Sequence, residues 1–164
     1  MFEVDKFNGS QDEMYAELLR QTRGLLDGER DLVANAANLA ALIWQIVPDL
    51  YWVGFYFMKG GELVLGPFQG KPACVRIAVG KGVCGTAALE RRSLLVRDVH
   101  EFPGHIACDA ASNAELVLPL IKGGRLHGVL DLDSPLVGRF DRRDQAGFEE
   151  LVSVFTAMTE YADA

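Results

Sequence analysis

Cys108 has the local surroundings of a reactive thiol. It lies in the segment GHIACDAASNAE (104–115), among small and polar residues rather than in an apolar run. A useful thiolate needs partial exposure and a nearby cation or backbone N–H groups. His105 and the main-chain amides are suitable sources, whereas Asp109 opposes ionisation. We therefore interpret Cys108 as a candidate nucleophile, with a buried core thiol as the alternative.

Two further cysteines, Cys74 and Cys84, are separated by nine residues, and no C-x-x-C motif occurs. Three cysteines, an odd number, do not suggest a secreted disulfide scaffold. Structural zinc sites use close ligand pairs, so His100, His105 and the cysteines match that pattern poorly. We expect no metal and no bound cofactor. The thiols are then either redox-active groups or small core side chains.

Three carboxylates are expected to meet at one end of the predicted sheet. Asp131 and Asp133 in GVLDLDS share one face of a strand because side chains alternate along it. The Gly-Gly pair at 123–124 predicts a hairpin that brings Glu115 beside them. Mutual repulsion should raise at least one pKa, leaving an acid that can protonate a departing oxygen, or an anionic socket for an ammonium group. The alternative is a solvated acidic edge.

An aromatic pair and a glycine-rich segment complete the candidates. Trp52 and Tyr56 are four residues apart in YWVGFYFM and should share a strand face. They fit either core packing or a wall for a sulfoxide methyl group. The segment VGKGVCG (79–85) lacks the Lys-Ser/Thr ending of a phosphate-binding loop. We interpret it as a mobile loop that carries Cys84 and leads into a short helix.

Periodicity predicts the elements that position these residues. Expected helices follow the caps Asp31 and Asp141, after a first helix at 11–27. Strands are expected at 51–58, 63–68, 73–80, 94–99, 115–122 and 125–133. The second helix is expected to bury one face, composed of Val33, Ala36, Ala37, Ala40, Ile43 and Val47. Leu132 and Val129 are expected to face the helices.

This order predicts an α+β domain with a six-stranded antiparallel sheet and the N- and C-terminal helices on one face. The long loops at about 80–115 would cover the other face and leave a pocket there. We expect one domain over 1–164, with about residues 1–10 as an N-terminal extension. No apolar stretch reaches the ~20 residues of a membrane span, and the N-terminus does not resemble a signal peptide. The expected location is cytoplasmic.

Charge excludes further partners. The net charge is −7 and no Lys/Arg block exceeds two residues. Polyanions are bound by clustered cations, so we expect neither nucleic acid nor an anionic membrane as a partner.

Three blocks of the chain resemble a known family. LGPFQGKPACVRIAVGKGVCGTA, DVHEFPGHIACDAASNAELVLPL and GVLDLDSPLVGRF occur in this order. They are similar to the free methionine-(R)-sulfoxide reductases, single-domain enzymes with a GAF-like fold, and the resemblance covers nearly the whole chain from about Phe7. It implies a homodimer that reduces free methionine-(R)-sulfoxide without a cofactor and is recycled by a thioredoxin-like reductant.

The resemblance also implies roles for the candidate residues. The nucleophile would be Cys108, with Cys74 as resolving cysteine and Cys84 as a third redox thiol on a loop that closes over the site. Substrate would contact Trp52, Tyr56, Glu115, Asp131, Asp133 and backbone N–H groups near Ile106, Ala107 and Cys108. Cys108 would become a sulfenic acid and then form a disulfide with Cys74 or Cys84. Which of the two resolves, and which carboxylate carries the proton, stays open.

Two other function classes compete with a reductase. One is a GAF module that senses a small ligand without catalysis, although an acidic pocket repels phosphate-bearing nucleotides. The other is a metal-bound regulatory protein.

Overall fold

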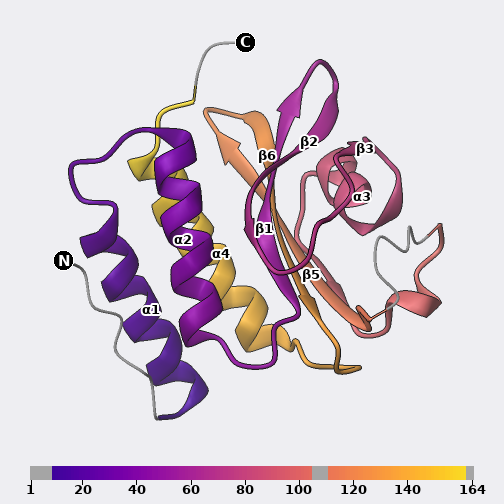
Figure 1. The fold of residues 1–164 in the computed structure, drawn as a ribbon, viewed down its shortest axis with the longest axis horizontal. Coiled ribbons are helices and arrows are strands. Elements are labelled where there is room, and N and C mark those ends of the chain that lie inside the picture. Colours follow the sequence, from indigo (N-terminus) through magenta and orange to yellow (C-terminus); the bar gives the residue numbers. More distant parts are fainter. Residues whose placement is uncertain (1–8, 105–110, 162–164) are drawn as a thin grey trace.

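Residues 9–104 and 111–161 are described by the computed structural model (Figure 1). Its elements, in chain order, are α1 (Gln11–Leu25), α2 (Leu32–Ile46), β1 (Trp52–Lys59), β2 (Glu62–Gln69), β3 (Arg76–Ala78), α3 (Gly82–Glu90), β4 (Leu94–Val96), the 3₁₀ turn η1 (Val99–Glu101), β5 (Ala114–Lys122), β6 (Arg125–Ser134) and α4 (Arg142–Met158). No helix in these two stretches is long and apolar enough to cross a membrane.

One antiparallel sheet with the order β3-β2-β1-β6-β5-β4 divides the molecule into two layers. Helices α1, α2 and α4 cover one face, and the shorter α3 lies on the other (Figure 1). The helix-side core contains Leu18, Phe55, Leu132 and Phe155, all fully buried. The rings of Phe55 and Phe155 stack with centroids 4.9 Å apart. The predicted α+β architecture is confirmed.

The caps of the second and last helices form as the sequence predicts. Asp31 accepts a hydrogen bond from the backbone N–H of Ala34 at 2.8 Å. Asp141 accepts bonds from the N–H groups of Arg143 and Asp144. These carboxylates satisfy donors that a helix N-terminus leaves free and oppose the positive end of the helix dipole.

The predicted buried face of α2 is wrong at two positions. Val33 is 60% exposed and Ala37 is also exposed. The helix contains no charged residue, so apolar side chains surround it and their spacing does not select one face. The side chains buried against the sheet layer include Leu39 and Ile46, which the prediction omitted.

Two predicted strands are shorter than expected, and one residue faces the opposite way. The regular part of 73–80 is β3 alone, and 94–99 divides into β4 and η1. Both are edge strands with one neighbour to hold them. Val75, expected on a buried face, is 63% exposed. Val129 lies with the pocket-side cluster, because it is two residues from Asp131; Leu130 takes the helix side instead.

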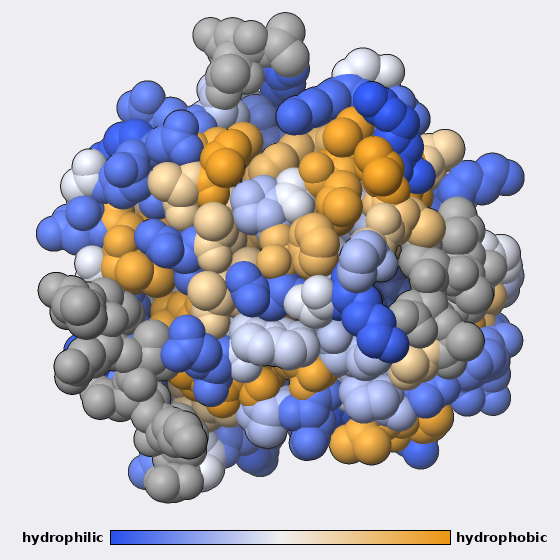
Figure 2. Space-filling view, viewed as in Figure 1, coloured by the Kyte–Doolittle hydropathy of each residue, from blue (hydrophilic) through white to orange (hydrophobic). Residues whose placement is uncertain are grey.

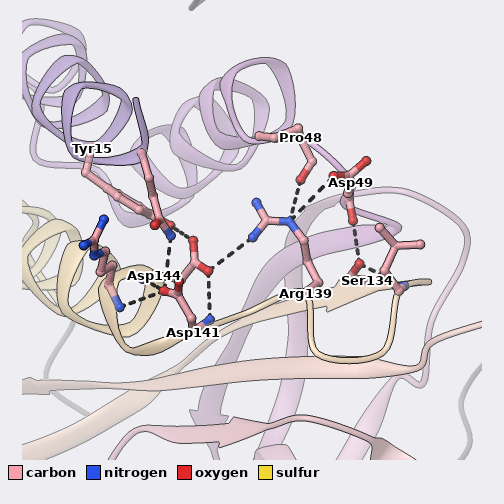
Figure 3. A network of polar contacts seen from close by, with 10 residues as sticks. Tyr15, Pro48, Asp49, Ser134, Arg139, Asp141 and Asp144 are labelled. Carbon is pink, nitrogen blue, oxygen red and sulfur yellow. Dashed lines mark hydrogen bonds and ion pairs between the residues drawn. The ribbon is translucent and has the colours of Figure 1, made fainter. Parts of the chain in front are cut away.

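A buried carboxylate joins the helix layer to the end of β6 (Figure 3). Asp144 is 1% exposed and accepts a hydrogen bond from the Tyr15 hydroxyl at 2.6 Å. The Arg139 guanidinium lies 3.2 Å from its other oxygen and also donates to the carbonyl of Pro48. This network connects α1, α4 and the turn that precedes β1.

We expect Tyr15→Phe to lower the free energy of unfolding by about 1.5 to 3 kcal/mol, the range for hydrogen bonds to charged groups. The aromatic packing against Phe148 would be kept, since that ring contact needs no hydroxyl. Urea unfolding measures the change. Glu62→Gln, which breaks an exposed ion pair with Arg76, is the control and should cost less than about 1 kcal/mol. Equal losses in the two variants would contradict a special role for the Asp144 network.

Candidate active site

A pocket lies between the sheet and α3; its empty volume is about 670 Å³ when the solvent at its open mouth is included. Its lining residues are Tyr51, Trp52, Tyr56, Lys71, Pro72, Ala73, Ile77, Lys81, Gly82, Val83, Cys84, Ser112, Glu115, Asp131 and Asp133. The predicted pocket is therefore present, and it gathers all the predicted aromatic and carboxylate side chains. Helix α3 rather than loops alone forms its second wall.

Strand register brings the carboxylates together. Glu115 of β5 pairs directly with Asp133 of β6, and Val117 pairs with Asp131. On the other side of β6, Trp52 pairs with Asp133 and Gly54 with Asp131. Directly opposed and alternate residues share one face of a sheet. The expected meeting of the three carboxylates is confirmed by this register.

Trp52 and Tyr56 form one wall of the pocket. Their rings stack with centroids 5.9 Å apart, and Trp52 also stacks on Phe68 at 5.3 Å. Gly54 separates them on the strand. A Cβ added there would lie 2.6 Å from the Trp52 ring and 2.3 Å from the Phe68 Cβ, so only glycine lets the indole lie flat here.

Hydrogen bonds connect the aromatic wall to the segment that carries Cys74. The Trp52 Nε1–H donates to the carbonyl of Lys71 at 3.1 Å, and the Tyr56 hydroxyl donates to the carbonyl of Cys74 at 3.1 Å. Burial raises the pKa of Tyr56, and the nearby Asp131 adds to the rise. The phenol therefore stays protonated and remains a donor at neutral pH.

Cys84, Glu115 and Asp131 form a buried polar cluster. One potential ligand atom from each lies within 4.8 Å of the other two. The Cys84 thiol donates to Glu115 Oε1 at 3.8 Å, while Oδ1 of Asp131 has no hydrogen-bond partner among the described residues. Burial first, and the neighbouring carboxylates second, raise the pKa of Glu115 and of Asp131 well above their usual range. The cluster can hold protons at neutral pH.

Asp133 differs from the other two carboxylates. It is only partly buried, and the hydroxyl of Ser112 donates to its Oδ1 at 2.5 Å. A hydroxyl donor stabilises the charged form of a carboxylate. The site thus combines two deeply buried acids with a third carboxylate at its edge.

Cys84 does not lie on a loop as predicted. It is in the first turn of α3, 4% exposed, and burial with the neighbouring Asp131 raises the pKa of its thiol. The helix can approach β3 closely because Gly85 has no side chain: a Cβ there would lie 2.4 Å from the carbonyl oxygen of Ala78. A neutral, enclosed thiol is a weak nucleophile.

The two cysteines within the described residues differ in state. Cys74 is disulfide-bonded and Cys84 is a free thiol. Cys108 lies outside the described residues, as do Ile106, Ala107 and His105. Their predicted roles stay predictions.

Sequence analysis missed several residues of the pocket. Ser112 was not singled out, although a serine three residues before Glu115 was a usable signal for a hydrogen-bond partner. Lys71 and Lys81 also line the pocket. They lie before and after the predicted strand 73–80 in the sequence. Isolated lysines next to glycine or proline are typical of solvated loops, so their sequence context does not indicate a pocket. Their position became evident only from the fold.

The fold defines the class of protein. A family model described as GAF domain matches residues 29–158. The matched residues include the whole sheet and the pocket on the face opposite α1, α2 and α4.

Closer relatives define the family within this class. A free methionine-R-sulfoxide reductase of Escherichia coli is 51% identical over 141 residues, covering 86% of this chain and 86% of that protein. The corresponding protein of Saccharomyces cerevisiae is 41% identical, with 90% of this chain and 86% of that protein covered. The structure of free methionine-R-sulfoxide reductase from Neisseria meningitidis in complex with its substrate has a TM-score of 0.93 and 39% identity, over 96% of this chain and 95% of that one. The chain belongs to the free methionine-R-sulfoxide reductase family of enzymes.

The raised pKa values of the buried acids predict how stability varies with pH. Glu115 and Asp131 ionise in the unfolded chain near pH 4.5 and 3.8, but in the folded state they keep their protons to a higher pH because their pKa values are raised. Their stabilising contribution is complete below these values and is lost as pH rises through the folded pKa values. We expect Asp131→Asn to exceed the wild type in unfolding free energy by about 1 to 3 kcal/mol at pH 7.5, and to match it near pH 4.

The control for this measurement is Asp98→Asn. Contact with His100 lowers the pKa of Asp98, so its effect on stability has the opposite sign and is lost as pH falls. Urea unfolding at a series of pH values compares the three proteins. A gain for Asp131→Asn that is the same at pH 4 and 7.5 would contradict the assignment.

Proposed function

We propose that this protein reduces free L-methionine (R)-S-oxide to L-methionine. The observation that carries the proposal is the buried acid pair, Glu115 and Asp131, on the same sheet face and in the same pocket as the stacked rings of Trp52 and Tyr56. A sulfoxide has an apolar methyl group beside a basic oxygen. The rings suit the methyl group, and a protonated carboxyl group suits the oxygen.

In the proposed reaction, the Cys108 thiolate attacks the sulfoxide sulfur. A proton from Glu115 or Asp131 passes to the sulfoxide oxygen, and the S–O bond breaks as the S–S bond to Cys108 forms. The released hydroxide then attacks the Cys108 sulfur and breaks that S–S bond. Methionine leaves with the two electrons lost by the cysteine, and the oxygen stays on Cys108 as a sulfenic acid. The raised pKa values of the two acids support this role, since a group that keeps its proton at neutral pH can donate it.

We propose Cys74 as the resolving thiol. Its thiol would condense with the Cys108 sulfenic acid to give a disulfide and water. The participation of Cys74 in a disulfide supports this choice, as does the raised pKa of the enclosed Cys84. A dithiol reductant of the thioredoxin class would then restore both thiols. Such recycling requires a reducing compartment, so we propose a cytoplasmic location.

Selectivity for the free amino acid follows from charge. The substrate ammonium group would pair with Asp133 and its acidic neighbours, whereas a methionine sulfoxide inside a peptide has no such cation. A buried polar group without its partner is costly, and sites built around one discriminate strongly. Backbone N–H groups near Ile106 and Ala107 are proposed to bind the substrate carboxylate. We propose one functional domain over 1–164.

A coupled assay on separate epimers tests this proposal. With thioredoxin as reductant, we expect turnover of free methionine-(R)-sulfoxide and none of the S epimer or of N-acetylated substrate. Cys108→Ser should give no turnover. Asp131→Asn should lower kcat by about 10²- to 10⁴-fold, the usual contribution of a general acid.

Results that would sink the reductase proposal are an inactive wild type or unchanged activity in Cys108→Ser. Calorimetry separates the competing class: tight binding of a small ligand without turnover would favour a sensing GAF module. Asp98→Asn is the matched control: this half-buried carboxylate does not line the pocket, so the variant should keep full activity.

We further propose a homodimer formed through the exposed side of α2. The helix has no charged residue, and Val33 and Trp44 are 60% and 38% exposed. Figure 2 shows mostly apolar residues over the middle of the face where α2 and β2 lie. An exposed helix face that combines apolar side chains with uncharged polar ones, here Asn38 and Gln45, suits contact with a second protein surface.

Sedimentation tests the dimer directly. Val33→Glu should weaken self-association by at least about tenfold, because it places a charge in an apolar contact. Leu136→Glu alters a residue of similar exposure on the turn after β6 and is the control. A monomeric wild type, or equal weakening by both variants, would exclude this interface.

A further inference from the structure

The cluster of Cys84, Glu115 and Asp131 contains groups that can bind a metal ion as well as groups that can donate a proton. Its three potential ligand atoms lie within 4.8 Å of one another, and all three residues are more than nine-tenths buried. Oδ1 of Asp131 is buried in the same cluster and has no hydrogen-bond partner within the described stretches. An unsatisfied carboxylate oxygen beside a thiol and a second carboxylate is a strong set of ligands for a cation. We propose that these residues bind a thiophilic divalent cation, with Zn²⁺ as the best-suited metal.

The distances support a compact coordination sphere. Zinc bonds to oxygen and sulfur of about 2.0 and 2.3 Å place tetrahedral S and O ligands about 3.5 Å apart. The Cys84 sulfur is already 3.8 Å from Glu115 Oε1. All three ligand atoms lie within 4.8 Å of one another, so movements of about 1 Å by side-chain rotation would reach this spacing. The open pocket leaves a fourth position for water.

The ligand types select among metals. A thiolate with two carboxylates suits Zn²⁺ and its spectroscopic substitutes Co²⁺ and Cd²⁺. Magnesium and calcium prefer all-oxygen coordination and gain nothing from Cys84. Binding releases the protons of the thiol and the acids, and the dication then offsets the repulsion among the anions that this deprotonation creates.

Such a cation would block the enzyme rather than assist it. It would occupy the acids that the proposed reaction needs for proton transfer, and it would replace the ammonium group as their counter-charge. We therefore infer competition between Zn²⁺ and methionine sulfoxide. The competition depends on the proposed function, whereas metal binding itself does not, so each can fail separately.

Optical titration of the full chain with Co²⁺ tests the site. The oxidised protein is used, because Cys74 is then disulfide-bonded and Cys84 offers a free thiol. We expect visible d–d bands of a tetrahedral ion and a near-ultraviolet sulfur-to-cobalt band, both removed by Zn²⁺ and unaffected by Mg²⁺. Cys84→Ser should lose the sulfur band. Asp131→Asn should weaken binding at least about tenfold, because loss of even an indirect metal contact has that effect.

The control variant is His100→Gln, which removes an exposed histidine beside Asp98 and tests for adventitious surface binding. It should leave the titration unchanged. Absence of the sulfur band in the wild type, or the same band in Cys84→Ser, would overturn the proposed site. Circular dichroism establishes that each variant is folded. If Cys84→Ser does not fold, Asp131→Asn still tests the site, because asparagine has the same shape as aspartate. Zinc binding without any effect on turnover would retain the site but exclude competition.

Discussion

Repulsion among carboxylates enclosed on one face of the sheet is the constraint on which this structure depends. Glu115 and Asp131 are both more than nine-tenths buried, and Asp133 is paired directly beside Glu115. Burial of an ionised carboxylate costs several kcal/mol after relaxation, and like charges add to that cost. The fold must therefore be stable enough elsewhere to hold these groups in place. Protonation of these acids reduces the cost, and the proposed reduction of the sulfoxide would use the same protons.

The opposite face of the sheet supplies that stability. Alternation along β5 and β6 sends Leu116, Leu130 and Leu132 into the helix-side core while the acids face the pocket. Each fully buried leucine contributes on the order of 2 kcal/mol of transfer free energy. The two faces are linked rigidly by the strands themselves. A one-residue slip of β6 would exchange the leucines for the aspartates, so the hydrophobic core also fixes the register of the site.

The sequence was sufficient for those parts of the site that depend on alternation and turn chemistry. The Gly-Gly turn and the spacing of Asp131 and Asp133 are enough to predict the carboxylate cluster. Prediction failed where tertiary contacts decide the outcome. Cys84 was placed on a loop because glycines surround it, but those glycines allow α3 to lie against β3. The exposed position of Val33 could not be derived either, since an uncharged helix has no pattern that marks its outer side.

The position of Cys84 in a helix changes what that thiol can do. A cysteine on a loop can reach a sulfenic acid at little cost in free energy. Cys84 is enclosed in the first turn of α3, so that turn would have to unwind or shift before the thiol could react outside its present position. Burial first, and then its neighbours Asp131 and Glu115, raise the pKa of the Cys84 thiol. Cys74 instead lies before the short edge strand β3, on a segment held to the pocket by the hydroxyl of Tyr56. This arrangement supports the proposed exchange role of Cys74, because Cys74 lies on an edge segment whereas Cys84 is enclosed in α3 beside the acids.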